Sequence, residues 1–323
     1  NKMKAVMWRK YGDTKKALSV ESDIAIPEIT KDNQVLVKIE YASLHPGDDH
    51  IMRPLMFPIR FMFGLFSPKN RVFGMNGSGI VHKVGDSVTE YKVGDKVFTD
   101  SIGLGALSEY QLVTDKRCCK IPSHMSTKEA AALGTSSSTA QYIVDLLDIK
   151  ENQTVLVTGA SGGVGSSLVM LFNQAGVIVT GVASGKHEES IRKLGANEFI
   201  DYKKTDWAND DNKYDYIVDC YNTLNSKGIK TMVAKKESIY YHIGGNAFMS
   251  AVWASITDKK VNLLTYDTNH ETMKNLVKNL EKDELKVPIA KEFDSLEKVF
   301  DAMDFLMNSN KSVLGKLVIK VQQ

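Results

Sequence analysis

Residues 159–165 have the composition and spacing of a phosphate-binding turn. This segment, Gly-Ala-Ser-Gly-Gly-Val-Gly, follows an apolar run at 154–158 that predicts a buried strand, and it leads into a predicted apolar helix at 164–175. Glycines allow a tight turn that approaches a pyrophosphate closely, and the N–H groups at the helix N-terminus meet its negative charge. Because the turn joins a strand to a helix, it predicts a dinucleotide site. The residues expected to contact the dinucleotide are Ala160, Ser161, Gly162, Gly163 and Val164.

The loop after the second predicted strand bears on which dinucleotide is bound. In such folds this strand normally ends in an acidic residue that accepts a hydrogen bond from the 2′-hydroxyl of NAD. Here the strand at 177–182 runs into Ala-Ser-Gly-Lys-His, without a carboxylate that would repel a 2′-phosphate. Ser184 can donate a hydrogen bond and Lys186 a charge-assisted one, which favours NADPH over NADH. Alternatively, Lys186 is a solvated loop lysine.

A second group of chemically capable residues lies at 43–50, in the segment Ser-Leu-His-Pro-Gly-Asp-Asp-His. An imidazole can donate a hydrogen bond or a proton near neutral pH, which makes His45 a candidate catalytic residue. His45, Asp48, Asp49 and His50 could alternatively hold a metal ion. We favour the interpretation in which His45 lines a substrate cleft.

The size and composition of the chain limit the possible functions. Its 323 residues predict two domains, each with a core of its own. A net charge of +2, with lysines interspersed among acids, gives no electrostatic case for nucleic acid. No apolar run is long enough to predict a membrane span. The three cysteines cannot form a disulfide framework, so a reducing, cytoplasmic setting is expected; they are Cys118, Cys119 and Cys220.

The pattern of predicted elements changes near Ser126. Before it, strands with irregular spacing predict a β-rich, partly open barrel; they are expected at 4–9, 34–42, 79–84, 96–99 and 108–113. Ser126 and Glu129 form a capping box that predicts a helix start at 130–133. Strands and helices then alternate, which predicts an α/β fold with a doubly wound parallel sheet. The later strands are expected at 154–158, 177–182, 199–200, 214–219 and 238–243, and the later helices at 164–175, 188–194 and 225–233.

With these motifs in order, the chain resembles the medium-chain dehydrogenase/reductase superfamily over nearly its full length. Within that superfamily it resembles the zinc-free, quinone oxidoreductase-like branch. The motifs that carry the resemblance are those at 73–81, 93–97, 105–110 and 129–133, the glycine-rich turn, Leu-Gly-Ala at 194–196 followed by Asp-Tyr at 201–202, and Gly-Lys-Leu-Val at 315–318.

The resemblance implies how the chain is divided. A GroES-like catalytic domain, the partly open barrel, would comprise residues 1–123 together with the predicted helix and strand of the C-terminal tail, at 287–323. A Rossmann domain that binds NADPH would be inserted at 124–286. The substrate is expected to bind where the two domains meet. Pairing of edge strands in this family suggests a homodimer.

The resemblance also assigns residues to the cofactor. By motif position, Tyr202 should lie beside the adenosine phosphate and Thr139 on the nicotinamide side. Ile243 and Gly244, at the end of a late strand, should flank the nicotinamide. Alternatively, Tyr202 is a half-buried packing residue and Thr139 a helix residue that bonds to its own backbone.

The three zinc-ligand positions of related alcohol dehydrogenases carry unsuitable residues in this chain. The first position aligns with His45, the usual Gly-His-Glu is replaced by Gly-Met-Asn at 74–76, and the third ligand falls near Thr135. Methionine and threonine are poor zinc ligands, so no bound metal is expected.

Without a Lewis acid, the substrate must already be an electrophile that accepts hydride. Members of the zinc-free branch typically reduce quinones or double bonds conjugated to a carbonyl, and some act on aldehydes. The protein then aligns the nicotinamide with the acceptor and stabilises the developing oxyanion. His45 is the first candidate for this role, although the branch often has asparagine there, and Asn76 or Ser136 could serve instead.

The segment 51–67 is rich in methionine and phenylalanine. Such side chains can line a pocket for a flat, apolar substrate, or they can simply pack a loop helix.

Two other function classes are compatible with parts of the sequence. A short-chain dehydrogenase would share the pattern of the glycine-rich turn, but it needs a Tyr-x-x-x-Lys pair downstream, and the only such spacing, at Tyr11 and Lys15, lies upstream. A non-catalytic NADPH-binding sensor or scaffold on the same fold is the alternative function.

Overall fold

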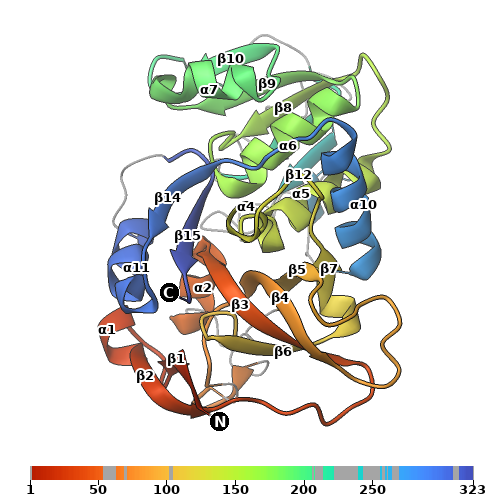
Figure 1. Ribbon diagram of the computed structural model, residues 1–323. Coiled ribbons are helices and arrows are strands. Elements are labelled where there is room, and N and C mark those ends of the chain that lie inside the picture. Colours follow the sequence, from red (N-terminus) through yellow and green to blue (C-terminus); the bar gives the residue numbers. More distant parts are fainter. Residues whose placement is uncertain are drawn as a thin grey trace. The chain divides into compact units, whose positions relative to one another are not determined.

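The computed structural model describes residues 2–53, 63–68, 71–101, 105–205, 207, 214–221, 239–242, 255–256, 259, 261–263, 269–307 and 313–322. The chain forms two compact units (Figure 1). Unit 1 comprises residues 1–138, 268–311 and 316–323, and unit 2 comprises residues 139–267 and 312–315.

Unit 1 is built on a seven-stranded sheet in the order β14-β15-β3-β4-β5-β7, with β6 paired to β3. Its strands are β3 (Gln34–Leu44), β4 (Asn76–Val84), β5 (Lys96–Asp100), β6 (Tyr110–Thr114), β7 (Cys118–Lys120), β14 (Ile289–Phe293) and β15 (Lys316–Lys320). A separate antiparallel pair, β1 (Lys2–Trp8) and β2 (Leu18–Ala25), is connected through the short helix α1 (Thr14–Ala17).

Alternating apolar residues explain why these strands pack as they do. In β3, Val35, Val37 and Ile39 are fully buried in the core of unit 1. Burial of each such side chain contributes roughly 1.5–3 kcal/mol relative to exposure. The β1 residue Trp8 extends this core, and its ring lies 5.8 Å from that of Phe73.

The C-terminal tail is part of the unit 1 sheet. Strand β15 pairs antiparallel with β3, and β14 pairs parallel with β15. Between these two strands lie η4 (Leu296–Lys298) and helix α11 (Val299–Met307), which bury Val299, Ala302 and Met303 in the core of unit 1.

The observed boundaries differ from the expected 1–123, 124–286 and 287–323. Helix α4 (Thr127–Ala130) and helix α10 (His270–Lys282) both belong to unit 1. Long-range polar contacts explain this placement, because the Thr127 hydroxyl of α4 donates to Glu40 of β3 at 2.5 Å, and the Tyr91 hydroxyl lies 2.8 Å from His270 Nε2 of α10. The capping box before α4 is present as predicted, with Ser126 and Glu129 bonded reciprocally.

Unit 2 contains a six-stranded, wholly parallel sheet in the order β10-β9-β8-β11-β12-β13. Its strands are β8 (Thr154–Thr158), β9 (Ile178–Ala183), β10 (Glu198–Asp201), β11 (Tyr216–Asp219), β12 (Ile239–His242) and β13 (Val261–Leu263). Helix α6 (Gly163–Gln174) connects β8 to β9, and helix α7 (Glu188–Lys193) lies between β9 and β10. The strand order reverses between β8 and β11, which confirms the doubly wound, Rossmann-type sheet.

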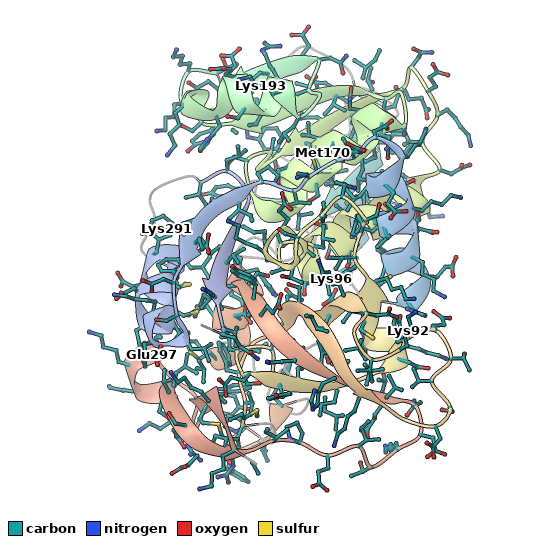
Figure 2. The ribbon with its side chains drawn as sticks, in the orientation of Figure 1. Lys92, Lys96, Met170, Lys193, Lys291 and Glu297 are labelled. Carbon is teal, nitrogen blue, oxygen red and sulfur yellow. The ribbon has the colours of Figure 1, made fainter. Side chains whose placement is uncertain are left out.

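Side-chain placement in unit 2 follows the apolar pattern of the sequence. Met170 of α6 is buried, whereas Lys193 at the end of α7 projects outward (Figure 2). The helix predicted at 225–233 lies outside the described residues. Within the described part of the chain, no helix has the length and hydropathy needed to cross a membrane.

Candidate active site

The register of the unit 1 sheet gathers four polar residues at one end of neighbouring strands. His45 follows the last residue of β3, Asn76 begins β4, and Asp100 ends β5 directly opposite Asn76. Lys316 is the first residue of β15, and the next residue, Leu317, pairs with Leu44, the last residue of β3. These four side chains are all buried, so strand pairing alone forms a polar cluster inside an otherwise apolar unit.

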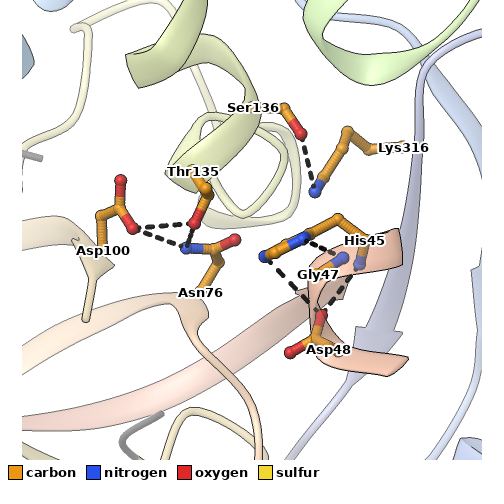
Figure 3. Close-up of polar contacts among 8 residues, drawn as sticks. All are labelled: His45, Gly47, Asp48, Asn76, Asp100, Thr135, Ser136 and Lys316. Atoms are coloured by element: carbon orange, nitrogen blue, oxygen red, sulfur yellow. Dashed lines mark hydrogen bonds and ion pairs between the residues drawn. The ribbon is translucent and has the colours of Figure 1, made fainter. Parts of the chain in front are cut away.

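The N-terminus of helix α5 (Gly134–Leu147) completes the cluster. A methyl group at Gly134 would collide with the side chain of Asn76, so only glycine allows this close approach. The approach brings Thr135 Oγ1 to 2.9 Å from Asn76 Nδ2 and Ser136 Oγ to 3.3 Å from Lys316 Nζ (Figure 3).

His45 is held as the N-cap of helix α2 (Pro46–Met52). Its Nδ1 accepts a hydrogen bond of 3.0 Å from the N–H of Gly47, and its own N–H donates to Asp48 Oδ2 at 2.9 Å. Because Nδ1 acts as an acceptor, the proton of the neutral ring is on Nε2. Burial, followed by the charges of Lys316 and His50, lowers the pKa of His45 well below its ordinary value.

The His45 ring is therefore a hydrogen-bond donor rather than a proton donor at neutral pH. Its Nε2 lies 3.7 Å from Asp48 Oδ2, which is too long for a hydrogen bond. Among the described residues, Nε2 has no hydrogen-bond partner. A buried N–H without an acceptor is costly, which indicates that the position is built to receive a ligand atom.

Asp48 and Lys316 are buried ionisable groups with opposite shifts. Burial raises the pKa of Asp48 to about 7, against the lowering effect of backbone hydrogen bonds from His45 and Met75 and of the Lys316 charge. Burial lowers the pKa of Lys316 to about 8, against the raising effect of the Asp48 and Asp100 charges. Burial therefore favours the neutral form of each group, and the opposite charges of the two groups favour the ionised forms.

Asn76 is oriented by a hydrogen-bond triangle. Its Nδ2 donates to Asp100 Oδ1 at 3.1 Å and to Thr135 Oγ1 at 2.9 Å, and the Thr135 hydroxyl donates to the same Asp100 oxygen at 2.9 Å. The amide oxygen of Asn76 has no partner among the described residues and points toward the His45 ring (Figure 3). The cluster thus presents an acceptor as well as donors.

This donor set does not fit a catalytic zinc ion, which takes three protein ligands drawn from cysteine, histidine and carboxylates. The three positions hold an imidazole whose Nδ1 is engaged, the thioether of buried Met75 and the hydroxyl of Thr135. Asp49 is ion-paired with Arg53 at 2.8 Å and His50 is exposed, so the four polar residues of 43–50 do not converge.

The glycine-rich turn in unit 2 has the tight geometry that the sequence predicts. Gly159 adopts a left-handed conformation with φ of 60°, and a methyl group at Gly165 would collide with the Gly159 carbonyl oxygen. Gly162 is the N-cap of α6 and provides no side-chain cap, which leaves the start of a twelve-residue helix available for an anion. These features fit a pyrophosphate, and Ala160, Ser161, Gly163 and Val164 line the same turn.

An acidic residue of the neighbouring strand lies beside the end of β9. Ser184 is buried and Lys186 is exposed. However, Asp201 of β10 pairs with the last residue of β9, and a methyl group at Gly185 would collide with its carboxylate. The β9 loop itself lacks a carboxylate, but the neighbouring strand supplies one beside it. Tyr202, the next residue, is 46% exposed.

Only some of the remaining predicted site residues lie in the described part of the chain. Thr139 is buried at the start of unit 2, in helix α5. Ile243 and Gly244 lie outside the described residues. In the segment 51–67, Met52 and Phe63 pack in the core of unit 1, whereas Phe66 is 90% exposed, and residues 54–62 lie outside the described part.

Lys316 and Asp100 are site residues that sequence reasoning missed. Lys316 stands at the head of the apolar run Leu-Val-Ile, and a lysine that begins a buried strand is the signal that could have identified it. Its neighbours in the cluster are more than a hundred residues away in the sequence, so no local pattern brings them together.

Comparison with known proteins places the chain in a family. Residues 31–123 match the alcohol dehydrogenase GroES-like domain, and residues 194–319 match the zinc-binding dehydrogenase family. The chain is 31% identical, over 99% of its length, to 2-methylene-furan-3-one reductase of Solanum lycopersicum, of which it covers 79%. It is 29% identical to the chloroplastic quinone-oxidoreductase homolog of Spinacia oleracea, over 98% of both chains.

The fold comparison agrees with the sequence comparison. The quinone oxidoreductase from Coxiella burnetii superimposes over 100% of both chains with a TM-score of 0.85 and 26% identity. Relatives of this kind are oxidoreductases that use nicotinamide cofactors, and the short-chain dehydrogenase hypothesis is excluded. The chain belongs to the quinone oxidoreductase-like branch of the medium-chain dehydrogenase/reductase superfamily.

Proposed function

We propose that this oxidoreductase reduces an activated acceptor, such as a quinone, an enone or an aldehyde, with hydride from NADPH and without zinc. The observation that carries the proposal is the buried His45 Nε2–H, which has no acceptor among the described residues and stands at a former zinc-ligand position. A hydrogen-bond donor at this position can take over the polarising role of a metal. The acceptor must then carry an oxygen that becomes negative as hydride arrives.

The chemistry of the acceptor follows from this donor. A quinone, an enone and an aldehyde each place the developing negative charge on a carbonyl oxygen, where His45 can hydrogen-bond to it. The activities for which the relatives are named support this class, since a 2-methylene-furan-3-one contains a double bond conjugated to a ketone and a quinone contains two conjugated carbonyls. The Asn76 amide oxygen can accept a hydrogen bond from a hydroxyl or protonated oxygen of the same acceptor.

The cofactor would be held by unit 2. When bound, it supplies hydride from C4 of the nicotinamide. The turn formed by Ala160, Ser161, Gly162, Gly163 and Val164 would bind the pyrophosphate through backbone N–H groups. Ser184, Lys186 and Tyr202 would bind the 2′-phosphate of NADPH, and Lys186 provides the positive charge at this position. Thr139, Ile243 and Gly244 are proposed to contact the nicotinamide half.

The test is NADPH oxidation measured against a panel of quinones, enones and aldehydes, with NADH in parallel. Turnover of at least one class, faster with NADPH, is expected. The variant His45→Phe should lose about 100-fold in kcat/KM, because it removes the oxyanion donor. Tight NADPH binding with no turnover across the whole panel would contradict the proposal and favour a sensor or scaffold on the same fold.

A further inference from the structure

The strongest unexplained feature of the polar cluster is the burial of Lys316. Only 3% of the residue is exposed, and its Nζ is hydrogen-bonded to the Ser136 hydroxyl at 3.3 Å. The charges of Asp48 and Asp100 act on this amine. Burial opposes the charged form of a lysine, so a lysine held inside a polar cluster calls for a functional explanation.

The geometry points to a proton-donating pair: Ser136 Oγ binds the carbonyl oxygen of the acceptor and protonates it, and Lys316 Nζ resupplies the proton to Ser136. This inference rests on the proposed reductase function and names the proton source for it. The pair lies on unit 1, in the same cluster as His45 and Asn76 (Figure 3).

Two carboxylates act on the charge of Lys316, Asp48 of α2 and Asp100 of β5. His45, whose own pKa is lowered by the Lys316 charge, is the neutral neighbour. The two carboxylates favour the ammonium form and burial opposes it, with the result that the pKa of Lys316 falls from 10.5 to about 8. An ammonium group with a pKa near 8 can release a proton during turnover and recover it from solvent at neutral pH.

His45 cannot perform this step, although it lies in the same cluster. Its Nδ1 is engaged by Gly47 and burial keeps the ring neutral, so it can donate a hydrogen bond but holds no removable proton at neutral pH. A serine hydroxyl bonded to an ammonium can accept one proton and donate another in the same step. His45 therefore serves as a fixed hydrogen-bond donor, and Ser136 and Lys316 transfer the proton.

The proposed step balances in atoms and electrons. When hydride forms a new C–H bond on an enone, the π electrons of the double bond move to the carbonyl oxygen. The O–H bond of Ser136 breaks as an O–H bond forms on the acceptor, and an N–H bond of Lys316 breaks to restore the serine hydroxyl. Lys316 then takes a proton from solvent. The acceptor gains one hydride and one proton, and the nicotinamide is oxidised.

The first test measures oxyanion binding without any turnover. The full chain is titrated with 4-nitrophenol, whose phenolate mimics the oxyanion and absorbs at longer wavelength than the phenol. We expect the protein to stabilise the phenolate and lower its apparent pKa. Lys316→Met should abolish this shift, whereas Lys316→Arg should retain it, because arginine keeps the charge. The matched control is Lys320→Met, four residues further along β15.

The second test separates proton donation from binding. Arginine does not release its proton in proteins, so Lys316→Arg should bind the phenolate but lose about 100-fold in kcat. Ser136→Ala should lose a similar factor, while Ser138→Ala, two residues along α5, should not. In the parent, kcat should fall as pH rises through the pKa of Lys316, since only the ammonium form donates. In Lys316→Arg this fall should be absent.

The outcomes distinguish the two proposals. A parent that reduces no acceptor in the panel overturns the proposed function. An active parent whose Lys316→Met, Lys316→Arg and Ser136→Ala variants keep its kcat and its phenolate binding overturns only the relay. If Lys316→Met does not fold, as judged by circular dichroism, the arginine and alanine variants still decide the question.

Discussion

Asn76 and Asp100 face each other across the β4–β5 ladder, and Nδ2 of the first donates to Oδ1 of the second at 3.1 Å. Because the same carboxylate oxygen also accepts from the Thr135 hydroxyl, the amide group has one orientation in which every donor is satisfied. That orientation turns the Asn76 oxygen toward His45. Asp100 is therefore the residue that decides which atom of Asn76 is available to a ligand.

Asp100→Asn should disturb this orientation. The new side chain can present an NH₂ group toward Asn76, and one buried donor then loses its acceptor. We expect a loss of about 1–3 kcal/mol in the free energy of unfolding, measured by urea denaturation. Asp86→Asn, at an exposed aspartate in the turn between β4 and β5, is the matched control and should change little. Equal stability of the two variants would show that the triangle does not orient Asn76.

Gly165→Ala should impair both folding and cofactor binding, since the added methyl group would collide with the carbonyl oxygen of Gly159. Overpacking of this kind lowers the free energy of unfolding by about 1–3 kcal/mol. Gly162→Ala is the control, because its methyl group would lie 3.3 Å from the same oxygen and its φ of −71° suits any residue. Thermal unfolding of both variants checks the effect on folding, and NADPH titration of Gly165→Ala checks the effect on cofactor binding. A turn that tolerates alanine equally at both positions would contradict the geometry.

The cofactor half of the site was predictable because its information is local. The strand at 154–158 coincides with β8, and the predicted helix at 164–175 differs from α6 by one residue at each end. A strand, a glycine-rich turn and an apolar helix are contiguous in the sequence, so spacing alone identifies them. Asp201 was missed because it comes to the β9 loop only through strand pairing.

The polar cluster of unit 1 was predictable only in part, because long-range register forms it. His45, Asn76 and Ser136 were candidates from the sequence, but Lys316 reaches them only through the pairing of β15 with β3. Other elements were missed for different reasons, of which β2 and α10 are examples. Strand β2 is largely half-exposed or exposed and has no clear apolar run, whereas α10 buries Met273, Leu276 and Leu280 at helical spacing, a signal that the sequence contains.

The two charges beside the end of β9 should control cofactor preference in opposite directions. Lys186→Glu should weaken NADPH binding by about 10- to 100-fold and NADH binding much less, because a charge-assisted bond to the 2′-phosphate contributes about 1.5–3 kcal/mol. Asp201→Asn should strengthen NADPH binding, because it removes a carboxylate that would repel the phosphate. Fluorescence titration with both cofactors checks each change. Equal affinity of the parent for the two cofactors would disprove the phosphate assignment.

The donor set at the former ligand positions predicts that the purified protein binds no stoichiometric zinc. Elemental analysis should find well under one zinc ion per chain, and added zinc or a chelator should leave the melting temperature and the reductase activity unchanged. The thioether of methionine and the hydroxyl of threonine are poor replacements for the cysteine, histidine or carboxylate ligands that hold zinc. One tightly held zinc per chain would require a different mechanism for polarising the acceptor.

The neutral state of His45 should appear in the pH dependence of stability. Its pKa in the folded state lies well below 6.5, so below pH 6.5 the unfolded chain takes up a proton on His45 that the folded chain does not. Stability should therefore fall by about 1 kcal/mol per pH unit from this source as the pH drops below 6.5. Asp48 acts in the opposite sense, because its raised pKa makes the folded state take up a proton first as pH falls through about 7.

The variant His45→Asn isolates the histidine from the opposing carboxyl. Asparagine can still cap α2 by accepting from the N–H of Gly47, but it does not titrate. Urea denaturation of both proteins between about pH 7 and pH 5 should show the parent losing stability relative to the variant as the pH falls, because only the parent must keep a buried imidazole neutral. Parallel curves would mean that His45 becomes protonated in the folded state, and the ring would then be a proton donor in its own right.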